Sequence, residues 1–359
     1  MKYFDRDSET ATEAKIRAQT LSFAPIAFQA ARLLRDFEIL STVRQAGKSG
    51  IALSDLQGKI DLPAYGVKVL AEAGLGIGLL YLSDGNFFLT KAGYFVMHDA
   101  QTRVNMDFTH HICYRGMFDL EQAIRAGQPV GLASLGDWPT VYHGVSVLPP
   151  QAKQSWLAFD HFYSDLAFPK ALPLVFQHHP KRLLDVGGNT GKWAMQCATY
   201  DPDVHVTIVD LPGQLAMMQA NVAQHGLSHR IDGYALDLLD PNKPFPKGYD
   251  VIWMSQFLDC FSLEQVVNIL QRAAAAMDET SRLFILEPYW DRQGNPTAAY
   301  CVQQTSLYFT CIANGNSQLY HSDDMTRSLA AAGLEIIEEA DEIGPSHTLT
   351  QCRLKSPST

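Results

Sequence analysis

The chain has 359 residues, of which 47% are hydrophobic and 18% are charged, and this balance excludes an intrinsically disordered protein. The length is sufficient for about two domains with cores of their own, which excludes a small disulfide-stabilised scaffold. Asp and Glu number 38 against 28 Lys and Arg, and the net charge of -10 disfavours nucleic acid as a partner, because phosphate binding depends on clustered cations.

The N-terminal third has the pattern of a winged helix. Residues 15–44 carry apolar side chains at helical spacing, and they predict two helices with a break or kink at Pro25. A further helix is expected to end at Gly74. Two apolar runs, 79–82 and 87–89, then flank an Asp-Gly turn, which predicts a β-hairpin.

A winged helix suggests DNA binding, but the charge of this one argues against it. The segment that would enter the groove, residues 61–72, has Lys68 as its single Lys or Arg and contains two acids, Asp61 and Glu72. This segment therefore has too few cations to displace counterions from DNA phosphates, which is the main driving force for DNA binding. We expect this domain to be a packing module and a dimer interface.

From Lys181 onward, short apolar runs alternate with helical patterns. The runs cover residues 182–186, 204–209, 249–254 and 283–286. Continuous apolar strands separated by helices indicate a parallel sheet that is covered on both faces. The sequence thus predicts an α/β, doubly wound, Rossmann-like domain, with the acidic run 335–342 as an exposed or edge feature.

The first of these runs leads directly into a glycine-rich turn. Asp185 is followed by Gly187, Gly188 and Gly191, and a helix is expected to start near Lys192. Glycines let the backbone approach a ligand, and a helix N-terminus offers free N–H groups, so we expect a nucleotide-like ligand. The spacing differs from G-x-G-x-x-G, and a carboxylate before the glycines would repel a pyrophosphate but pair with an ammonium group.

Two further acids follow later strands of the same domain. Asp210 comes nineteen residues after Gly191, close to the offset at which a strand-end carboxylate meets ribose hydroxyls. Asp237 follows a third strand and suits the exocyclic amine of adenine. Three acids and a glycine turn favour a cationic ligand that carries adenosine over a phosphorylated one.

Through these residues the chain resembles the two-domain class I S-adenosylmethionine-dependent O-methyltransferases, which include plant caffeate and flavonoid enzymes, hydroxyindole methyltransferase and bacterial natural-product enzymes. The resemblance covers nearly the whole length. Besides the glycine turn it rests on five segments: Leu89-Thr90-Lys91-Ala92-Gly93, the helix 159–165, Asp210-Leu211-Pro212, Asp237-Leu238-Leu239, and Glu287-Pro288.

The resemblance implies a winged-helix dimerisation domain over residues 1–100, a helical linker and acceptor-pocket region over 101–178, and a methyltransferase domain over 179–359. It implies S-adenosylmethionine as the cofactor, a homodimer, and a small aromatic substrate. The residues expected to bind the cofactor are Asp185, Gly187, Gly188, Gly191, Asp210, Leu211, Asp237, Leu238, Ser255, Phe159 and Tyr163.

The catalytic residues depart from the family pattern. The family usually has His-Asp-Trp after the fourth strand, with the His as general base, and Asp259 takes the place of that His here. A carboxylate can accept a phenol proton if burial beside Glu287 raises its pKa from about 3.9. Alternatively Asp259 caps a helix, although Ser262 and Gln265 already form a capping box. We predict catalytic roles for Asp259 and Glu287.

The acceptor site is expected to draw on residues outside these motifs. Four candidates are His111, Tyr114, Trp156 and Tyr308, and core packing is the alternative interpretation for each. The predicted activity is transfer of a methyl group to a phenolic acceptor, at oxygen or at a ring carbon. The alternative function is a non-catalytic S-adenosylmethionine-binding or regulatory protein that kept the fold but lost the catalytic His.

The remaining expectations concern metals and location. The six cysteines contain no C-x-x-C pair, which indicates neither a zinc site nor a disulfide framework and favours a reducing compartment. The first twelve residues lack the apolar stretch of a secretory signal, and no window reaches the ~18 apolar residues of a membrane span. The sequence therefore predicts a cytoplasmic protein with neither a metal nor a membrane partner.

Overall fold

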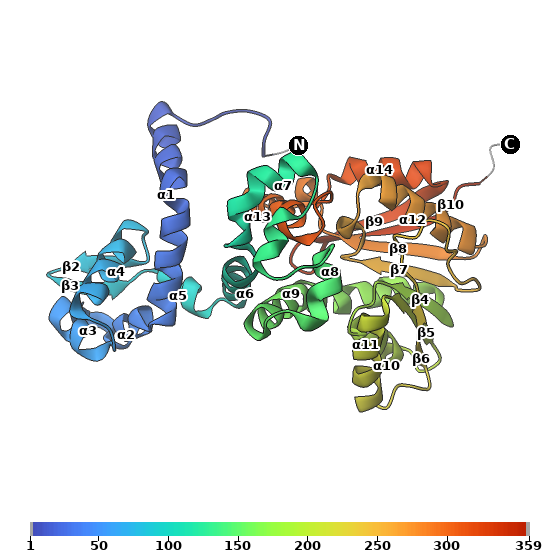
Figure 1. Ribbon diagram of the computed structural model, residues 1–359, viewed down its shortest axis with the longest axis horizontal. Helices are drawn as coiled ribbons and strands as arrows, with labels where there is room; N and C mark the ends of the chain where they lie inside the picture. Colours follow the sequence, from blue (N-terminus) through green and yellow to red (C-terminus); the bar gives the residue numbers. More distant parts are fainter. Residues whose placement is uncertain (1–2, 357–359) are drawn as a thin grey trace. The chain divides into compact units, whose positions relative to one another are not determined.

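The computed structural model describes residues 3–356, and the chain divides into two compact units at Thr109 (Figure 1). The helices of the first unit are α1 (Ala11–Asp36), α2 (Ile39–Gln45), η1 (Gly47–Ser49), α3 (Leu53–Lys59), α4 (Ala64–Gly76), α5 (Lys91–His98) and α6 (Ala100–Phe108). Its strands are β1 (Ile51–Ala52), β2 (Leu80–Ser83) and β3 (Asn86–Leu89), and they form a sheet in the order β1-β3-β2. The predicted hairpin is thus confirmed, because β2 and β3 pair antiparallel.

The two predicted helices are present as α1 and α2, but the break between them does not lie at Pro25. Pro25 lies inside α1, which begins with a capping box formed by Thr10 and Glu13 and continues to Asp36. A proline removes one backbone donor, but propagation adds a hydrogen bond for each further residue, and the rest of this long helix retains its ladder. The chain turns instead at Glu38, which has a left-handed φ of 60°.

The second unit contains a seven-stranded sheet in the order β6-β5-β4-β7-β8-β10-β9. Its strands are β4 (Arg182–Val186), β5 (His205–Asp210), β6 (Ile231–Ala235), β7 (Val251–Ser255), β8 (Arg282–Glu287), β9 (Leu334–Ile343) and β10 (His347–Leu354). The strands β6, β5, β4, β7 and β8 are parallel, whereas β10 runs antiparallel to both of its neighbours. The predicted doubly wound fold is confirmed, and the acidic run lies on the edge strand β9.

Helices cover both faces of this sheet (Figure 1). The α-helices of the second unit are α7 (Leu120–Ala126), α8 (Val141–Gly144), α9 (Pro150–Val175), α10 (Lys192–Tyr200), α11 (Pro212–Gln224), α12 (Leu263–Ala276), α13 (Pro296–Tyr308) and α14 (Ser322–Ala331). Its 3-10 helices are η3 (Gly116–Asp119), η4 (Val130–Ser134), η5 (Val145–Val147), η6 (Phe176–His178), η7 (Leu258–Cys260) and η8 (Trp290–Arg292). Two short π-helices, η2 (Thr109–Cys113) and η9 (Phe309–Ala313), complete the helical elements that the structure describes.

Alternate residues of the central strands β4, β7 and β8 enter opposite cores, as a strand buried on both faces requires. Leu184 and Met254 pack with α12 and α14 on one face. Leu183 and Trp253 pack with α9, α10 and α11 on the other face, where Trp253 stacks on Trp193 at 4.0 Å between ring centroids. Packing in the two cores fixes the position of each strand along its own axis. It thereby also fixes the positions of the loops at the carboxyl ends of the strands. Among the described residues, no helix has the length and hydropathy that crossing a membrane requires.

Candidate functional site

The turn between β4 and α10 is a cradle that requires glycine. Gly187 and Gly191 have φ angles of +74° and +82°, in the left-handed region that side chains other than glycine rarely adopt. A Cβ atom on Gly187 would lie 2.3 Å from the ring of Phe257, and one on Gly188 would lie 2.6 Å from the carboxylate of Asp185. The backbone is therefore open to a ligand where side chains would fill the space.

Two buried carboxylates lie at this turn. Asp185 is 2% exposed and its Oδ2 atom has no hydrogen-bond partner, and burial raises its pKa to about 8 with a further contribution from the charge of Asp210. Asp210 accepts hydrogen bonds from the backbone N–H groups of Asn189 at 2.9 Å and Leu211 at 2.7 Å. Burial raises the pKa of Asp210 to about 6. Both acids favour a cation or a hydrogen-bond donor as a partner.

Unpartnered polar atoms around the turn fit S-adenosylmethionine. They are Asp185 Oδ2, Asn189 Oδ1, Ser255 Oγ and Gln256 Oε1, all buried and without a hydrogen bond. An ammonium group and ribose hydroxyls would supply the donors that the three acceptor oxygens lack. Phe159 and Tyr163 lie together on α9, with ring centroids 5.1 Å apart.

The third predicted acid lies in a different environment. Asp237 follows β6 and is exposed, and its Oδ1 accepts the backbone N–H of Leu239 at 2.9 Å. Leu238 beside it is buried, with 8% of its surface exposed. Because β6 is parallel to β5, this loop leaves the sheet at the same edge as Asp210, so an apolar contact and an exposed acid are available there.

The loop after β7 is held by Glu287, the last residue of β8. Glu287 Oε1 accepts the backbone N–H groups of Phe257 at 2.9 Å and Leu258 at 2.8 Å, whereas Oε2 has no partner. Glu287 is 2% exposed, and burial, followed by the charge of Asp259, raises its pKa well above its ordinary value. The structure thus places Glu287 directly against the loop that carries Asp259.

Asp259 is buried in that loop and does not cap a helix. It is 6% exposed, and burial raises its pKa to about 7, with the charge of Asp160 acting in the same direction. The predicted capping box of Ser262 and Gln265 is present at the start of α12. Cys260 Sγ lies 3.3 Å from Asp259 Oδ1 and donates to it. A carboxyl group with these properties can exchange a proton near neutral pH.

Three of the four acceptor candidates meet at one turn of α9. Trp156 Nε1 donates to the hydroxyl of Tyr308 at 2.8 Å, and the neighbouring Ser155 Oγ lies 2.8 Å from His111 Nδ1. His111 belongs to the π-helix η2 and Tyr308 directly precedes the π-helix η9, and π-helical turns occur frequently at functional sites. Tyr114 lies next to His110, with ring centroids 6.4 Å apart, and the His110 ring in turn lies 4.9 Å from that of His111.

Several residues of the site were missed by the sequence analysis. Asp160 on α9 accepts hydrogen bonds from Gln256 Nε2 at 3.2 Å and Asn189 Nδ2 at 3.4 Å. Tyr142 on α8 has a buried hydroxyl without a partner, and burial, then Cys260, raises its pKa. Asp160 lies within the helix segment that carries the family resemblance, which was the available signal. Tyr142 has no comparable signal in the sequence.

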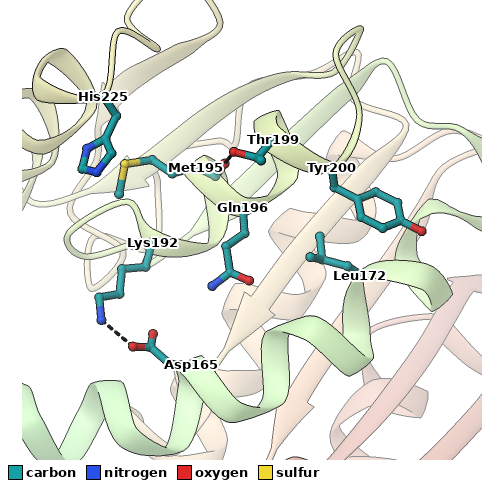
Figure 2. Close-up of a pocket in the computed structure, with 8 residues that line it drawn as sticks. All are labelled: Asp165, Leu172, Lys192, Met195, Gln196, Thr199, Tyr200 and His225. Atoms are coloured by element: carbon teal, nitrogen blue, oxygen red, sulfur yellow. Dashed lines mark hydrogen bonds and ion pairs between the residues drawn. The ribbon is translucent and has the colours of Figure 1, made fainter.

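A hollow of about 510 Å³ lies along α10 but does not coincide with this site (Figure 2). Asp165, Leu172, Lys192, Met195, Gln196, Thr199, Tyr200 and His225 line it. Its polar feature is an ion pair of 2.6 Å between Lys192 and Asp165. None of the residues predicted for the site lines this hollow. Within residues 3–356, no group of three or more His, Cys, Asp or Glu side chains is arranged to hold a metal ion.

Comparisons with known proteins agree with this architecture. The family model of the Dimerisation2-like domain matches residues 15–87, and that of the O-methyltransferase domain matches residues 163–334. L-tyrosine C(3)-methyltransferase of Streptomyces lavendulae is 24% identical over 318 residues, which cover 87% of this chain and 84% of the relative. Bacteriochlorophyllide d C-20 methyltransferase of Chlorobaculum tepidum is 23% identical over 248 residues, covering 65% and 68% of the two chains.

Solved structures show the same fold. The S-adenosylmethionine-dependent methyltransferase SibL in its apo form has a TM-score of 0.72 at 22% identity, over 94% of this chain and 98% of that chain. The O-methyltransferase NcsB1, in complex with S-adenosyl-L-homocysteine and 1,4-dihydroxy-2-naphthoic acid, has a TM-score of 0.67 at 19% identity. That alignment covers 92% of this chain and 96% of NcsB1.

Proposed function

The chain belongs to the two-domain S-adenosylmethionine-dependent O-methyltransferase family, and from this premise we propose that its acceptor is a small phenol whose hydroxyl proton passes to Asp259. The observation that carries the proposal is the burial of Asp259 in a loop whose backbone is bonded to Glu287. The names of two similar proteins, an L-tyrosine C(3)-methyltransferase and an enzyme crystallised with a dihydroxynaphthoic acid, support an aromatic acceptor.

The chain's own residues have two tasks in this reaction. When bound, S-adenosylmethionine supplies a methyl group on a positively charged sulfur, so the donor is already activated. Asp185 and Asp210 would hold the ammonium group and the ribose hydroxyls, and the glycine turn gives the backbone access to them. Asp259 takes the proton from the acceptor hydroxyl, and its pKa of about 7 makes the carboxylate available near neutral pH.

The acceptor atom is either the phenol oxygen or a ring carbon beside it. By the family resemblance, Asp259 stands where most members have a His that serves as base, and the L-tyrosine C(3)-methyltransferase is named for methylation at carbon. A phenolate activates its own ring, so removal of one proton from the hydroxyl prepares both positions. At carbon, the ring hydrogen of the methylated dienone must also leave as a proton, which regenerates the phenolate, and Glu287, whose Oε1 holds the backbone of the loop that carries Asp259, would orient that base.

Product analysis tests this proposal. The protein is incubated with S-adenosylmethionine labelled in the methyl group and with one phenol in each reaction. The phenols are L-tyrosine, catechol and 1,4-dihydroxy-2-naphthoic acid. Mass spectrometry with fragmentation distinguishes a methyl ether from a ring-methylated product. Transfer to at least one phenol supports the proposal. Tight binding of S-adenosylhomocysteine with no transfer to a broader phenol panel would overturn it and favour the non-catalytic alternative.

We also propose that the chain forms a homodimer through its first unit and works in the cytoplasm. The match to a dimerisation domain supports the dimer, as do Ile16, Leu21, Phe23 and Ile26 of α1, each at least 60% exposed. The isolated spacing of the six cysteines supports a reducing compartment. Light scattering tests the dimer: Phe23→Glu should shift the mass toward the monomer, whereas Lys48→Glu at another exposed site of the same unit should not.

A further inference from the structure

One carboxylate bridges the two loops of the site. Asp160 projects from α9, and its Oδ1 accepts from Gln256 Nε2 at 3.2 Å while its Oδ2 accepts from Asn189 Nδ2 at 3.4 Å. Asn189 belongs to the glycine turn after β4, and Gln256 directly follows β7. These two strands are neighbours in the sheet, so the turns leave it side by side. Asp160 therefore contacts the cofactor turn and the base-carrying loop at the same time.

Both partners of Asp160 have a left-handed backbone. Asn189 has φ of 49° and Gln256 has φ of 48°, a conformation that Asn adopts more readily than Gln. Such conformations persist only where the surroundings hold them. The backbone N–H of Asn189 donates to Asp210, that of Gln256 donates to Leu286 O, and the two side chains donate to Asp160.

Asn189 is connected to Asp259 through Asp160 and the loop after β7. Asn189 lies among the atoms that a ligand at the glycine turn would touch, and its Oδ1 is buried without a partner. Gln256 is followed by Phe257 and Leu258, whose N–H groups bond to Glu287, and then by Asp259. A ligand that donates to Asn189 Oδ1 would thus bind the same amide whose Nδ2 donates to Asp160, and Asp160 in turn accepts from Gln256.

We propose that Asp160 is a positioning residue that transmits occupancy of the cofactor turn to the loop carrying Asp259. This inference rests on the proposed function, since it takes S-adenosylmethionine as the ligand of the turn. The bridge then does more than hold α9 in place. Asp259, the proposed base, reaches its working position only after the cofactor has bound. Cofactor binding before acceptor binding follows from it.

The same helix provides a matched control in Asp165. Asp165 Oδ2 pairs with Lys192, the first residue of α10, at 2.6 Å, and its Oδ1 has no partner. Asp165 therefore joins α9 to the end of the cofactor turn without a bond to Gln256. A variant at this position loses a carboxylate and a contact of α9, but leaves the bridge between the two loops intact.

Hydrogen–deuterium exchange with S-adenosylhomocysteine tests the bridge without an acceptor. In the wild type, the ligand should slow exchange both in residues 187–192 and in residues 255–261, by about threefold or more. In Asp160→Ala, the slowing should persist at 187–192 and be lost at 255–261. In Asp165→Ala, both segments should respond as in the wild type. Calorimetry on the same samples gives the affinity of each variant.

A second variant guards against misfolding of the first. Gln256→Leu removes the far end of the bridge while leaving α9 unchanged, and it should reproduce the loss at 255–261. Combining it with Asp160→Ala should add nothing further, because both changes break one connection. If 255–261 still respond in folded Asp160→Ala or in Gln256→Leu, the inference is wrong. If the wild type does not bind S-adenosylhomocysteine at all, the proposed function fails instead.

Discussion

The two halves of the site are built in different ways. The proposed cofactor half is centred on one strand–turn segment, residues 185–191, together with Asp210 at the end of the adjacent strand. The proposed acceptor half draws Tyr142, Trp156, Asp259 and Tyr308 from separate elements, with Trp156 and Tyr308 joined by a hydrogen bond. The first half is specified by local backbone geometry, whereas the second depends on how distant segments pack.

Both halves nevertheless use a buried acid whose pKa is raised. Burial raises the pKa of Asp185 to about 8 and that of Asp259 to about 7. In the proposed cofactor half, such an acid suits a ligand that brings a positively charged ammonium group. In the acceptor half, it suits a group that must gain and release a proton within each reaction cycle. The same physical condition therefore supports binding in one place and proton transfer in the other.

The largest effect is expected from removing the proposed base. Asp259→Ala should lower kcat by about 100- to 10,000-fold, the range that general-base catalysis contributes, and leave the affinity for S-adenosylhomocysteine unchanged. Turnover of the most reactive phenol and calorimetry measure the two quantities. Asp278→Ala, at an acid outside the site, is the control. Near wild-type turnover in Asp259→Ala would show that Asp259 is not the base, and the proposed division into a binding half and a proton-transfer half would be wrong.

The next largest effect concerns the cofactor half. Gly187→Ala places a Cβ atom 2.3 Å from the ring of Phe257 at a φ of +74°, so we expect the affinity for S-adenosylhomocysteine to fall about 100-fold. Gly226→Ala is the matched control, because Gly226 has φ of +69° but no atom within 4 Å of its Cβ position. Calorimetry on folded protein should show a loss in the first variant alone. Equal losses in both would mean that backbone strain, rather than the cradle, sets the affinity.

The unequal origin of the two halves explains what could be predicted from the sequence. The glycine turn, Asp185 and Asp210 were recognisable because a turn of fixed spacing after a strand has local signatures. Tyr142 had no local signature and Asp160 had only its place in the helix segment of the resemblance, since their importance comes from contacts with loops about 30 residues or more away, such as the bond from Asn189 to Asp160. The hairpin of β9 and β10 was missed for a related reason: its acidic, exposed edge lacks the apolar run of a central strand.

A smaller effect is expected at the ribose-facing acid. Asp210→Asn should weaken binding of S-adenosylhomocysteine about tenfold, because an amide has one acceptor oxygen where the carboxylate has two, and both are now engaged by backbone N–H groups. Asp232→Asn, at an exposed acid of the adjacent strand β6, should bind like the wild type. Calorimetry measures the affinity of both variants. An unchanged affinity in Asp210→Asn would show that Asp210 does not contribute to cofactor binding.

The smallest effect is a dependence of stability on pH. The folded-state pKa of Asp185, about 8, lies above the unfolded value of about 3.9, so the folded protein binds more protons between these values. Stability from this group is complete below about pH 4 and is lost as the pH rises toward 8. The thermal midpoint of the ligand-free protein should therefore fall between pH 5.5 and 8 by a few degrees more than that of Asp185→Asn. Parallel curves for the two proteins would contradict the assignment.

The strand order has a consequence for the making of the protein. In the sheet, β10 lies between β8 and β9, although it is the last of the three in the chain. While a ribosome is still adding residues 347–354, β9 has been synthesised but has no partner through which to reach β8. β9 therefore joins the sheet only through β10, and a chain cut before β10 would leave the edges of both β8 and β9 unpaired.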